Sequence, residues 1–301
     1  MKPWIKTSLI ALSGLAVLGA AGLALAAHLG ERKAQRRIEL AVAPLAVPAD
    51  AAALARGRYL YASRGCADCH GQDGAGRAFI DDGGGFYLKA PNISPGPGSV
   101  VAGYRAEDWV RTVRHGVKPD GRPLFIMPSE DYSRWSDADL GALVAWLRQM
   151  PPATGSGLQA RVPALVKALY GVGVIRDAAE KIDHRLPAPA VVAADGSPAH
   201  GAYVAGMCVG CHGAQLTGGK IPGAPPDWPA AADLTPGEGS VMARYPNAEA
   251  FIAMLRSGRR PDGSAVSKVM PFESLRELDD ADARALYDHL RRLAPLRVAS
   301  N

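Results

Sequence analysis

Two short motifs in this sequence carry residue types that can do chemistry. Cys66-Ala67-Asp68-Cys69-His70 and Cys208-Val209-Gly210-Cys211-His212 each place an imidazole directly after two thiols that are three positions apart. This C-x-x-C-H spacing is the attachment signature of c-type haem: each thiol bonds one vinyl group, and the histidine supplies the proximal nitrogen to iron. The motifs contain all four cysteines. The sequence therefore predicts two covalently attached haem c groups, with cofactor-binding residues Cys66, Cys69, His70, Cys208, Cys211 and His212.

Three other interpretations of paired cysteines fit less well. A structural zinc site of this kind has its cysteine pairs about 15–20 residues apart, whereas these pairs are separated by much of the chain. A thioredoxin-like redox pair needs a βαβ setting, and no strand-rich pattern surrounds either motif. A disulfide framework is typical of short secreted chains, not of one with 301 residues.

Two Met-Pro pairs supply candidates for the ligand on the other face of each iron. Met127-Pro128 and Met270-Pro271 follow their motif histidines by 57 and 58 positions. A single methionine is more often core filling, but two at matching repeat positions favour ligation. Methionine raises the haem potential relative to a second histidine, which suits a low-spin electron carrier. The predicted metal ligands are His70, Met127, His212 and Met270; Met254 is expected to pack in a core.

The segments around the motifs form two copies of one unit. Residues 92–100 and 233–241 are matching Pro/Gly-rich loops at an offset of 141, and such density favours turns over helix. A short helix is expected before each motif. Another apolar helix face follows each loop (Trp109, Val110 and Val113; Phe251, Ile252 and Leu255), with Gly116 or Gly258 as its stop and a Pro-Asp-Gly turn after it.

Each copy is expected to close with a helix. Ser136 and Asp279 are the candidate N-caps, and apolar stripes follow them at helical spacing (Leu140, Leu143, Val144 and Leu147; Leu286, Leu290 and Leu293). The fold class is therefore all-α, with two tandem domains at residues 50–152 and 196–297. Residues 38–53 are predicted to form a tether. Residues 153–195 are a linker in which 163–182 form an interrupted helix, expected to be a packed connector rather than a membrane-lying one.

The N-terminus, residues 1–37, is predicted to be a membrane anchor or signal segment. No Asp, Glu, Lys or Arg occurs in the 23 residues from Thr7 to Leu29, which as a helix span about 34 Å and cross a bilayer core. An uncleaved anchor is favoured over a removed signal, although Ala24-Leu25-Ala26 resembles a cleavage site. The bases Arg32, Lys33, Arg36 and Arg37 follow the run, and bases favour the cytoplasmic side. We let the haem motifs decide the orientation instead, which predicts haem domains on the periplasmic face of a bacterial inner membrane.

Charge argues against one class of partner. The net charge of +5 arises in the N-terminal segment, because residues 38–301 hold 28 basic and 28 acidic residues. A neutral body has no electrostatic footprint for nucleic acid.

The repeated pattern resembles a pair of class I cytochrome c domains, and more closely the membrane-bound cytochrome subunits of bacterial quinoprotein alcohol dehydrogenases. Those domains carry C-x-x-C-H, an Asn-Ile-[Ser/Thr]-Pro loop, Arg-x-Gly and Met-Pro in this order. The positions that match outside the motifs are Asn92, Arg114, Gly116, Met127, Arg256, Gly258 and Met270, while Asp233 departs from the asparagine. Many relatives have three haem domains, and this chain has two.

The resemblance implies a membrane-tethered dihaem electron carrier, more a non-catalytic electron-transfer protein or dehydrogenase subunit than an enzyme. Its donor would be a periplasmic dehydrogenase or quinol-oxidising complex, and its acceptor an oxidase or soluble cytochrome. The alternative is a dihaem peroxidase, which needs an open iron site and a nearby acid or base. His115 is the candidate there, but Ser257 stands at its repeat position. A structural subunit with vestigial haems is disfavoured by the two intact motifs.

Overall fold

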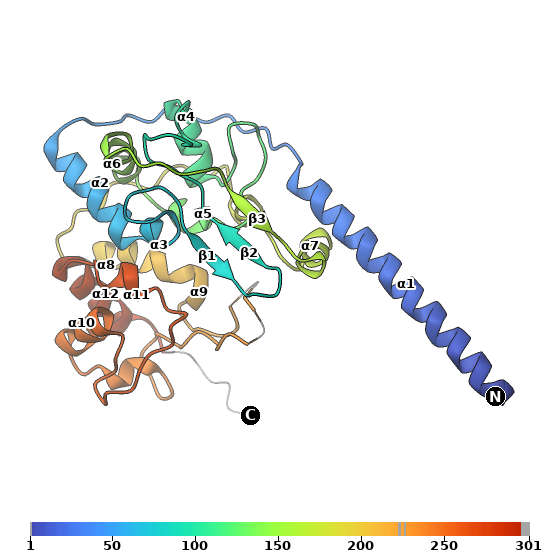
Figure 1. Ribbon diagram of the computed structural model, residues 1–301. Helices are drawn as coiled ribbons and strands as arrows, with labels where there is room; N and C mark the ends of the chain where they lie inside the picture. Colours follow the sequence, from blue (N-terminus) through green and yellow to red (C-terminus); the bar gives the residue numbers. More distant parts are fainter. Residues whose placement is uncertain (1, 222–223, 226, 296–301) are drawn as a thin grey trace.

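A computed structural model describes residues 2–295 of the chain, apart from 222, 223 and 226. A long N-terminal helix, α1 (Pro3–Ala34), projects from a body of two helical domains that lie one above the other (Figure 1). The predicted ends of the anchor at residue 1 and of the second domain at residue 297 lie outside the described residues. The observed architecture agrees with the all-α class and the tandem arrangement.

Domain one is built around two crossed helices. Asp50 caps the first of them by accepting a bond from the Ala53 amide (2.9 Å), and Leu60, Leu140 and Val144 fill the core between them. The helices of this domain, in chain order, are α2 (Ala51–Ser63), α3 (Cys66–His70), α4 (Ala106–Trp109) with a π-helical turn (Val110–Arg114), α5 (Ser129–Tyr132) and α6 (Asp137–Gln149).

Glycine makes the crossing of α2 and α6 possible. A side chain at Gly57 would collide with the Ala142 carbonyl oxygen and lie 2.8 Å from Trp146 Cβ. Gly201 has the same role in domain two, where a Cβ would lie 2.7 Å from His289 Cβ. In each domain, the glycine that precedes the motif therefore allows the close crossing of the two helices that support the motif.

We expect Gly57→Ala to destabilise domain one by about 1–3 kcal/mol, because the added methyl forces two backbones apart in a packed core. Denaturant unfolding followed by far-UV circular dichroism measures this loss. Gly103→Ala is the matched control, since nothing lies within 4 Å of a Cβ built there. Equal losses in the two variants would contradict the expectation.

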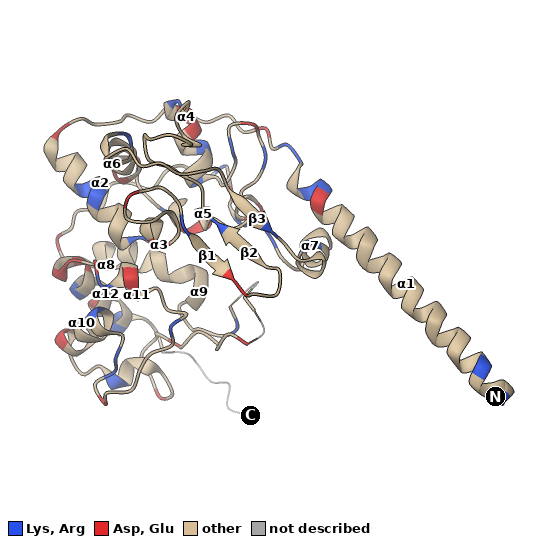
Figure 2. Cartoon of the chain, in the orientation of Figure 1, with Lys and Arg blue, Asp and Glu red and all other residues tan. Residues whose placement is uncertain are grey.

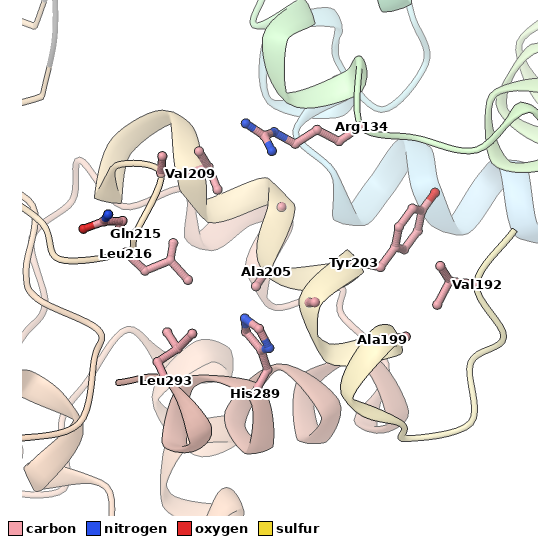
Figure 3. A pocket seen from close by; sticks show the side chains of 13 residues that line it. Arg134, Val192, Ala199, Tyr203, Ala205, Val209, Gln215, Leu216, His289 and Leu293 are labelled. Carbon is pink, nitrogen blue, oxygen red and sulfur yellow. The ribbon is translucent and has the colours of Figure 1, made fainter. Parts of the chain in front are cut away.

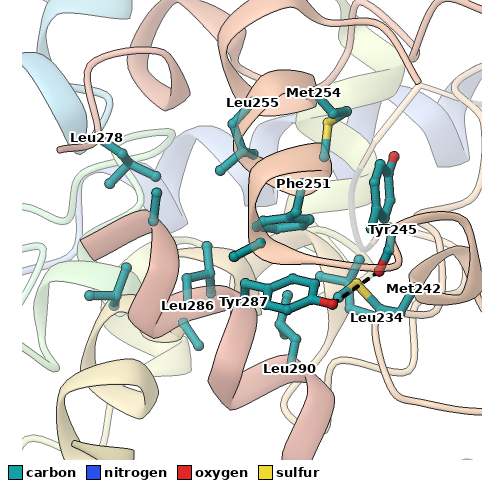
Figure 4. Close-up of a cluster of buried hydrophobic side chains, with 14 of the residues drawn as sticks. Leu234, Met242, Tyr245, Phe251, Met254, Leu255, Leu278, Leu286, Tyr287 and Leu290 are labelled. Carbon is teal, nitrogen blue, oxygen red and sulfur yellow. Dashed lines mark hydrogen bonds between the residues drawn. The ribbon is translucent and has the colours of Figure 1, made fainter. Parts of the chain in front are cut away.

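Domain two repeats this plan with a separate core. Figure 4 shows Met242, Phe251, Met254 and Leu255 meeting the last helix at Leu286 and Leu290, and the Tyr287 hydroxyl donates to the Tyr245 carbonyl (3.1 Å). Met254 is thus a core residue, as predicted. The helices are α8 (Pro198–Ala205), a 3₁₀ turn (Gly206–Cys208), α9 (Val209–His212), a 3₁₀ turn (Val241–Arg244), α10 (Ala248–Ser257), α11 (Phe272–Leu275) and α12 (Asp280–Arg292).

The predicted helix ends are confirmed in both domains. Gly116 and Gly258 adopt φ of 67° and 69°, the left-handed conformation that ends a helix without a Cβ clash. Ser136 accepts a bond from the Asp139 amide, and Asp279 accepts one from the Asp282 amide. These stops and caps hold the loops between the helices at matching positions in the two domains.

Domain one also contains a small sheet that the sequence did not predict. Strands β1 (Ala78–Asp81), β2 (Tyr87–Lys89) and β3 (Gln159–Arg161) pair antiparallel in the order β1-β2-β3. Strands this short have little periodicity of their own, and β3 comes from the predicted linker. Among the described residues of domain two, no strand corresponds to them.

The predicted tether and linker are both packed against domain one. Leu45 is buried in the domain-one core, and a Cβ at Gly141 of α6 would lie 2.5 Å from the Ala46 carbonyl oxygen. The tether prediction therefore missed a packed segment. In the linker, α7 (Ala164–Gly171) and a 3₁₀ turn (Ala178–Lys181) replace the interrupted helix expected at 163–182.

A histidine pair fastens the linker to domain one. His184 Nε2 lies 3.1 Å from the Ala179 carbonyl, which can only accept, so Nε2 carries the proton. His184 Nδ1 is then free to accept from His115 Nδ1, 3.1 Å away. Burial, the neighbouring His184 and the charges of Arg114 and Arg111 lower the pKa of His115 to about 4.

We expect this pair to make folding stability depend on pH. In the unfolded chain His115 has an ordinary pKa near 6.5. The neutral, buried His115 therefore does not oppose folding above about pH 6.5, and the free energy of unfolding decreases as the pH falls from 6.5 towards 4. Wild type should lose about 1–3 kcal/mol more than His115→Gln over this window. Unfolding curves of both proteins between pH 7.5 and 4 measure the difference, and parallel losses would refute the assignment.

The two domains face each other through a reciprocal exchange of tyrosines. The Tyr59 hydroxyl of domain one donates to Asp282 (2.7 Å) and accepts from the Asp279 amide (3.2 Å) in domain two. The Tyr203 hydroxyl of domain two donates to Asp139 (2.8 Å) and accepts from the Ser136 amide (3.1 Å) in domain one. Equivalent residues make equivalent contacts in both directions, so the domains are related by an approximate twofold axis.

Candidate haem attachment sites

The first C-x-x-C-H motif forms one helical turn, α3, after the first helix of its domain, and the second runs from the end of a 3₁₀ turn at Cys208 into α9. Gly71 and Gly213, directly after the histidines, have the same backbone angles (φ 79°, ψ 163°). Residues three and four apart are neighbours on a helix surface, so Cys66 lies next to both Cys69 and His70 on α3.

Loop carbonyls orient the two motif histidines. His70 Nδ1 lies 2.9 Å from the Pro91 carbonyl oxygen, and His212 Nδ1 lies 2.7 Å from that of Ala232. A carbonyl only accepts, so Nδ1 carries the proton and Nε2 keeps its lone pair for a metal. Burial lowers the pKa of both imidazoles, which favours the neutral form that binds iron.

The sequence did not predict this role of the Pro/Gly-rich loops. Pro91 and Ala232 directly precede the matched loops at residues 92–100 and 233–241 and share their offset of 141. In domain one the loop is held by Asn92, whose side-chain amide donates to the carbonyls of Pro97 (3.0 Å) and Ala153 (2.9 Å). In domain two Asp233 instead accepts from the Thr235 amide (2.7 Å). The common offset was the signal that could have revealed the carbonyls.

The motif thiols are unlike those of a redox pair. Burial raises the pKa of Cys66 to about 12, of Cys69 to about 11 and of Cys208 to about 12. Reactive cysteines of C-x-x-C oxidoreductases have a lowered pKa, because the thiolate is the nucleophile. All four cysteines are free of disulfides, so each is available for a thioether bond to haem.

The predicted methionine ligands lie at the cores that contain the motifs. Met127 packs on the core cluster that includes Cys66, and Met270 packs on the cluster that also contacts Cys208. Each Met-Pro pair leads into a one-turn helix, α5 or α11. Each predicted methionine therefore packs on the core that its motif also contacts, and its ligation of iron stays a prediction.

Buried donors without partners provide a test of whether haem fits domain one. The indole N–H of Trp109 and the Nε–H of Arg114 are both buried without a hydrogen-bond partner. Trp109 belongs to the core cluster that includes Cys66 and Met127. Haem carries two propionate groups, and a carboxylate acceptor bound near these donors would satisfy them. The residues present therefore fit the group that the motif predicts.

A separate hollow of about 500 Å³ lies behind α9 and between α8 and α12. Figure 3 shows His289, Leu216 and Leu293 around it, with Arg134 of domain one on the opposite side. None of the predicted iron ligands lines it. It is therefore not the haem site.

Each attachment turn contacts the other domain. Asp68 of α3 accepts a bond from Ser274 of α11 (2.5 Å), and Arg77 pairs with Glu273 of α11 (2.9 Å). Reciprocally, a Cβ at Gly210 of α9 would lie 2.8 Å from an Asp131 carboxylate oxygen of α5. Each attachment turn therefore lies against the helix that follows the Met-Pro pair of the other domain. The sequence contained no signal for this arrangement.

Comparison with known families matches both domains. Residues 52–147 match the family described as cytochrome c oxidase, cbb3-type, subunit III, and residues 199–294 match the cytochrome c family. Together with the two motifs, these matches define tandem cytochrome c domains, each with one covalently attached haem c. The chain is a dihaem c-type cytochrome, an electron-transfer protein.

Similar proteins include cytochrome subunits of dehydrogenases. The cytochrome c subunit of the quinone-dependent alcohol dehydrogenase of Gluconobacter oxydans is 27% identical over 84% of this chain and 57% of that protein. The fructose dehydrogenase cytochrome subunit of Gluconobacter japonicus is 28% identical over 45% of this chain and 29% of that protein. The gluconate 2-dehydrogenase cytochrome c subunit of Pantoea cypripedii is 34% identical over 33% and 23%. The chain thus spans between about a quarter and three fifths of the length of these relatives.

Proposed function

We propose that this protein is a membrane-tethered periplasmic cytochrome that carries electrons from a dehydrogenase or quinol-oxidising complex to an oxidase or soluble carrier. The observation that carries the proposal is the reciprocal interface, in which each attachment turn contacts the other domain. Two redox centres that share one interface suit a relay within a single chain. Similarity to dehydrogenase cytochrome subunits supports a dehydrogenase as the electron donor.

The residues of this chain hold and tune the cofactors, while the haem groups supply the one-electron chemistry. In this proposal Cys66, Cys69, Cys208 and Cys211 form the thioether bonds. His70 and His212 present Nε2 to iron because the Pro91 and Ala232 carbonyls hold Nδ1. Met127 and Met270 would supply the second protein ligand of each iron and keep small molecules from the metal.

Helix α1 supports the membrane tether. Among the described residues, α1 is the one helix long and apolar enough to cross a bilayer, and its apolar window is not buried in the body. As the proposed anchor, it holds the haem domains on the periplasmic face of a bacterial inner membrane.

Redox titration of the purified protein, with optical and EPR detection, tests the proposal. Two low-spin centres that are reduced by donor-containing membranes and reoxidised by their oxidases are the expected result. A stable high-spin centre that turns over peroxide would instead identify a peroxidase. The structure does not favour that alternative, since His115, its candidate acid or base, is bonded to His184 of the linker.

A further inference from the structure

The end of α1 is packed closely on α7 of the linker. A side chain at Gly30 would collide with the Lys167 carbonyl and lie 3.3 Å from the Gly171 amide nitrogen, and one at Gly171 would lie 2.6 Å from the Gly30 nitrogen. The two backbones therefore touch, as they do where glycines meet at helix crossings in membranes. The crossing leaves little freedom between the N-terminal helix and the body.

Charged contacts fix the same junction. Arg36 donates two bonds to the fully buried Asp177 carboxylate (2.7 and 3.1 Å) and a third to the Tyr170 hydroxyl (2.9 Å). Lys33 pairs with Glu180 (3.0 Å) and lies over the Tyr170 ring. Two of the four bases that follow the apolar run are thus used to dock α1 onto the linker.

The height of this crossing on α1 is informative. A side chain at Gly171 would also collide with the Ala26 carbonyl, and Ala26 lies three residues inside the uncharged run from Thr7 to Leu29. An α-helix rises 1.5 Å per residue. The end of α7 therefore meets α1 at a point about 4–5 Å before the uncharged run ends at Leu29. Figure 2 shows α1 free of charged residues between its two ends.

The chain at this level exposes aliphatic side chains. Val172 and Val174, in the turn after α7, are 61% and 67% exposed. Exposed aliphatic side chains that lie beside an exposed apolar helix are typical of a protein or membrane contact rather than of a surface in water. Val172 directly follows Gly171, the residue of α7 that meets the apolar run of α1 at Ala26.

We infer that the end of α7 and the turn to Val174 form a seat in the bilayer interface, with Val172 and Val174 in contact with lipid. The inference rests on the proposed membrane anchor, because the seat lies beside the end of α1. Interfacial elements bury their apolar face about 5–10 Å into the headgroup and acyl boundary, a range that the 4–5 Å level of Gly171 approaches. The seat fixes the tilt of the haem domains relative to the membrane, since a single spanning helix can itself tilt in the bilayer and would carry the attached domains with it.

Site-directed spin labelling of the full-length, haem-loaded protein tests the seat. Val174→Cys, Val191→Cys and Leu18→Cys are labelled singly in nanodiscs of phosphatidylethanolamine and phosphatidylglycerol, and collisions with oxygen and a water-soluble nickel chelate are measured. Val191 is the matched control: it is the same residue type, 72% exposed, in the linker near α8. The expected result is nickel accessibility several-fold lower at 174 than at 191, with oxygen accessibility higher.

The label at position 18 separates two kinds of failure. If it is in lipid while the label at 174 meets nickel as readily as the label at 191, the seat is wrong and the anchor stands. If the labels at 18 and 174 are both in water, the anchor fails and the seat with it. A label at 174 that neither reagent reaches indicates a protein partner on this face and also overturns the inference.

Gly171→Leu provides an independent variant. The added side chain separates α7 from α1, while the haem domains and their visible spectrum should not change. In this background the label at 174 is expected to gain nickel accessibility several-fold and to become more mobile. An unchanged label in Gly171→Leu would show that the α1–α7 crossing does not hold the seat, and would overturn the inference as stated.

Discussion

Replacing Met127 by alanine is expected to lower the reduction potential of the haem in domain one by hundreds of millivolts or to make it high-spin. Axial ligands set haem potentials over a range of about 0.8 V, and methionine raises the potential relative to histidine or water. Met127 packs at the core that contains Cys66. Redox titration followed in the α-band, with EPR of the oxidised protein, resolves the change at one haem while the other is unaffected. Met270→Ala should give the same change in domain two.

Met150→Ala separates ligation from packing in this experiment. Met150 is buried in the same core cluster as Cys66, so its loss leaves a cavity and lowers stability by about 2–5 kcal/mol. It is not placed to bind iron in our assignment, so the spin state and potential should stay close to wild type. Met127→Ala and Met150→Ala proteins with the same spectra would remove Met127 from the ligand set.

Replacing Asp282 by alanine is expected to destabilise the protein by about 3–5 kcal/mol, because it leaves a buried cation without its partner. Asp282 pairs with Arg64 of domain one (2.5 Å), and both side chains are at most 4% exposed. The same carboxylate accepts from Tyr59 and contacts His200 Nε2 (2.7 Å). Denaturant unfolding, followed separately by the haem absorbance and by far-UV circular dichroism, measures the loss and shows whether the domains now unfold separately.

The approximate twofold axis supplies the matched control for this prediction. Asp139 occupies the equivalent position in domain one and binds Tyr203 and Arg56, but its side chain and that of Arg56 are 12% and 31% exposed. Water can solvate the cation that Asp139→Ala leaves behind, so this variant should cost clearly less than Asp282→Ala. If Asp139→Ala and Asp282→Ala lower the free energy of unfolding by similar amounts, the unpaired buried charge of Arg64 is not the cause of the loss in Asp282→Ala.

The same network gives a direction for its pH dependence. Burial alone raises the pKa of the Asp282 carboxyl, but the Arg64 charge and the bonds from Tyr59, Arg64 and His200 outweigh burial and hold this pKa below its ordinary value. A lowered pKa contributes stability above the unfolded value near 4, and this contribution is lost as the pH falls further. The Asp282 contribution therefore fades at a lower pH than that of His115.

Local chemistry in the sequence was enough to predict the cofactor and the repeated unit. Two thiols three positions apart before a histidine have few other uses, and Gly116 and Gly258 end helices by a rule that acts within a few residues. The caps at Ser136 and Asp279 are equally local. Each of these features depends only on residues that are close together along the chain, so residue spacing in the sequence is enough to predict it.

Only the tertiary structure decided how the two units face each other. The bonds of Tyr59 to Asp282 and of Ser274 to Asp68 join residues more than 200 positions apart, and single polar residues at such separations leave no periodic signal. The sheet of domain one and the crossing of Gly30 with Gly171 were missed for the same reason, because each depends on a surface that exists only after folding. The sequence by itself determined which groups this protein binds, while the packing of distant surfaces decided how those groups are placed against each other.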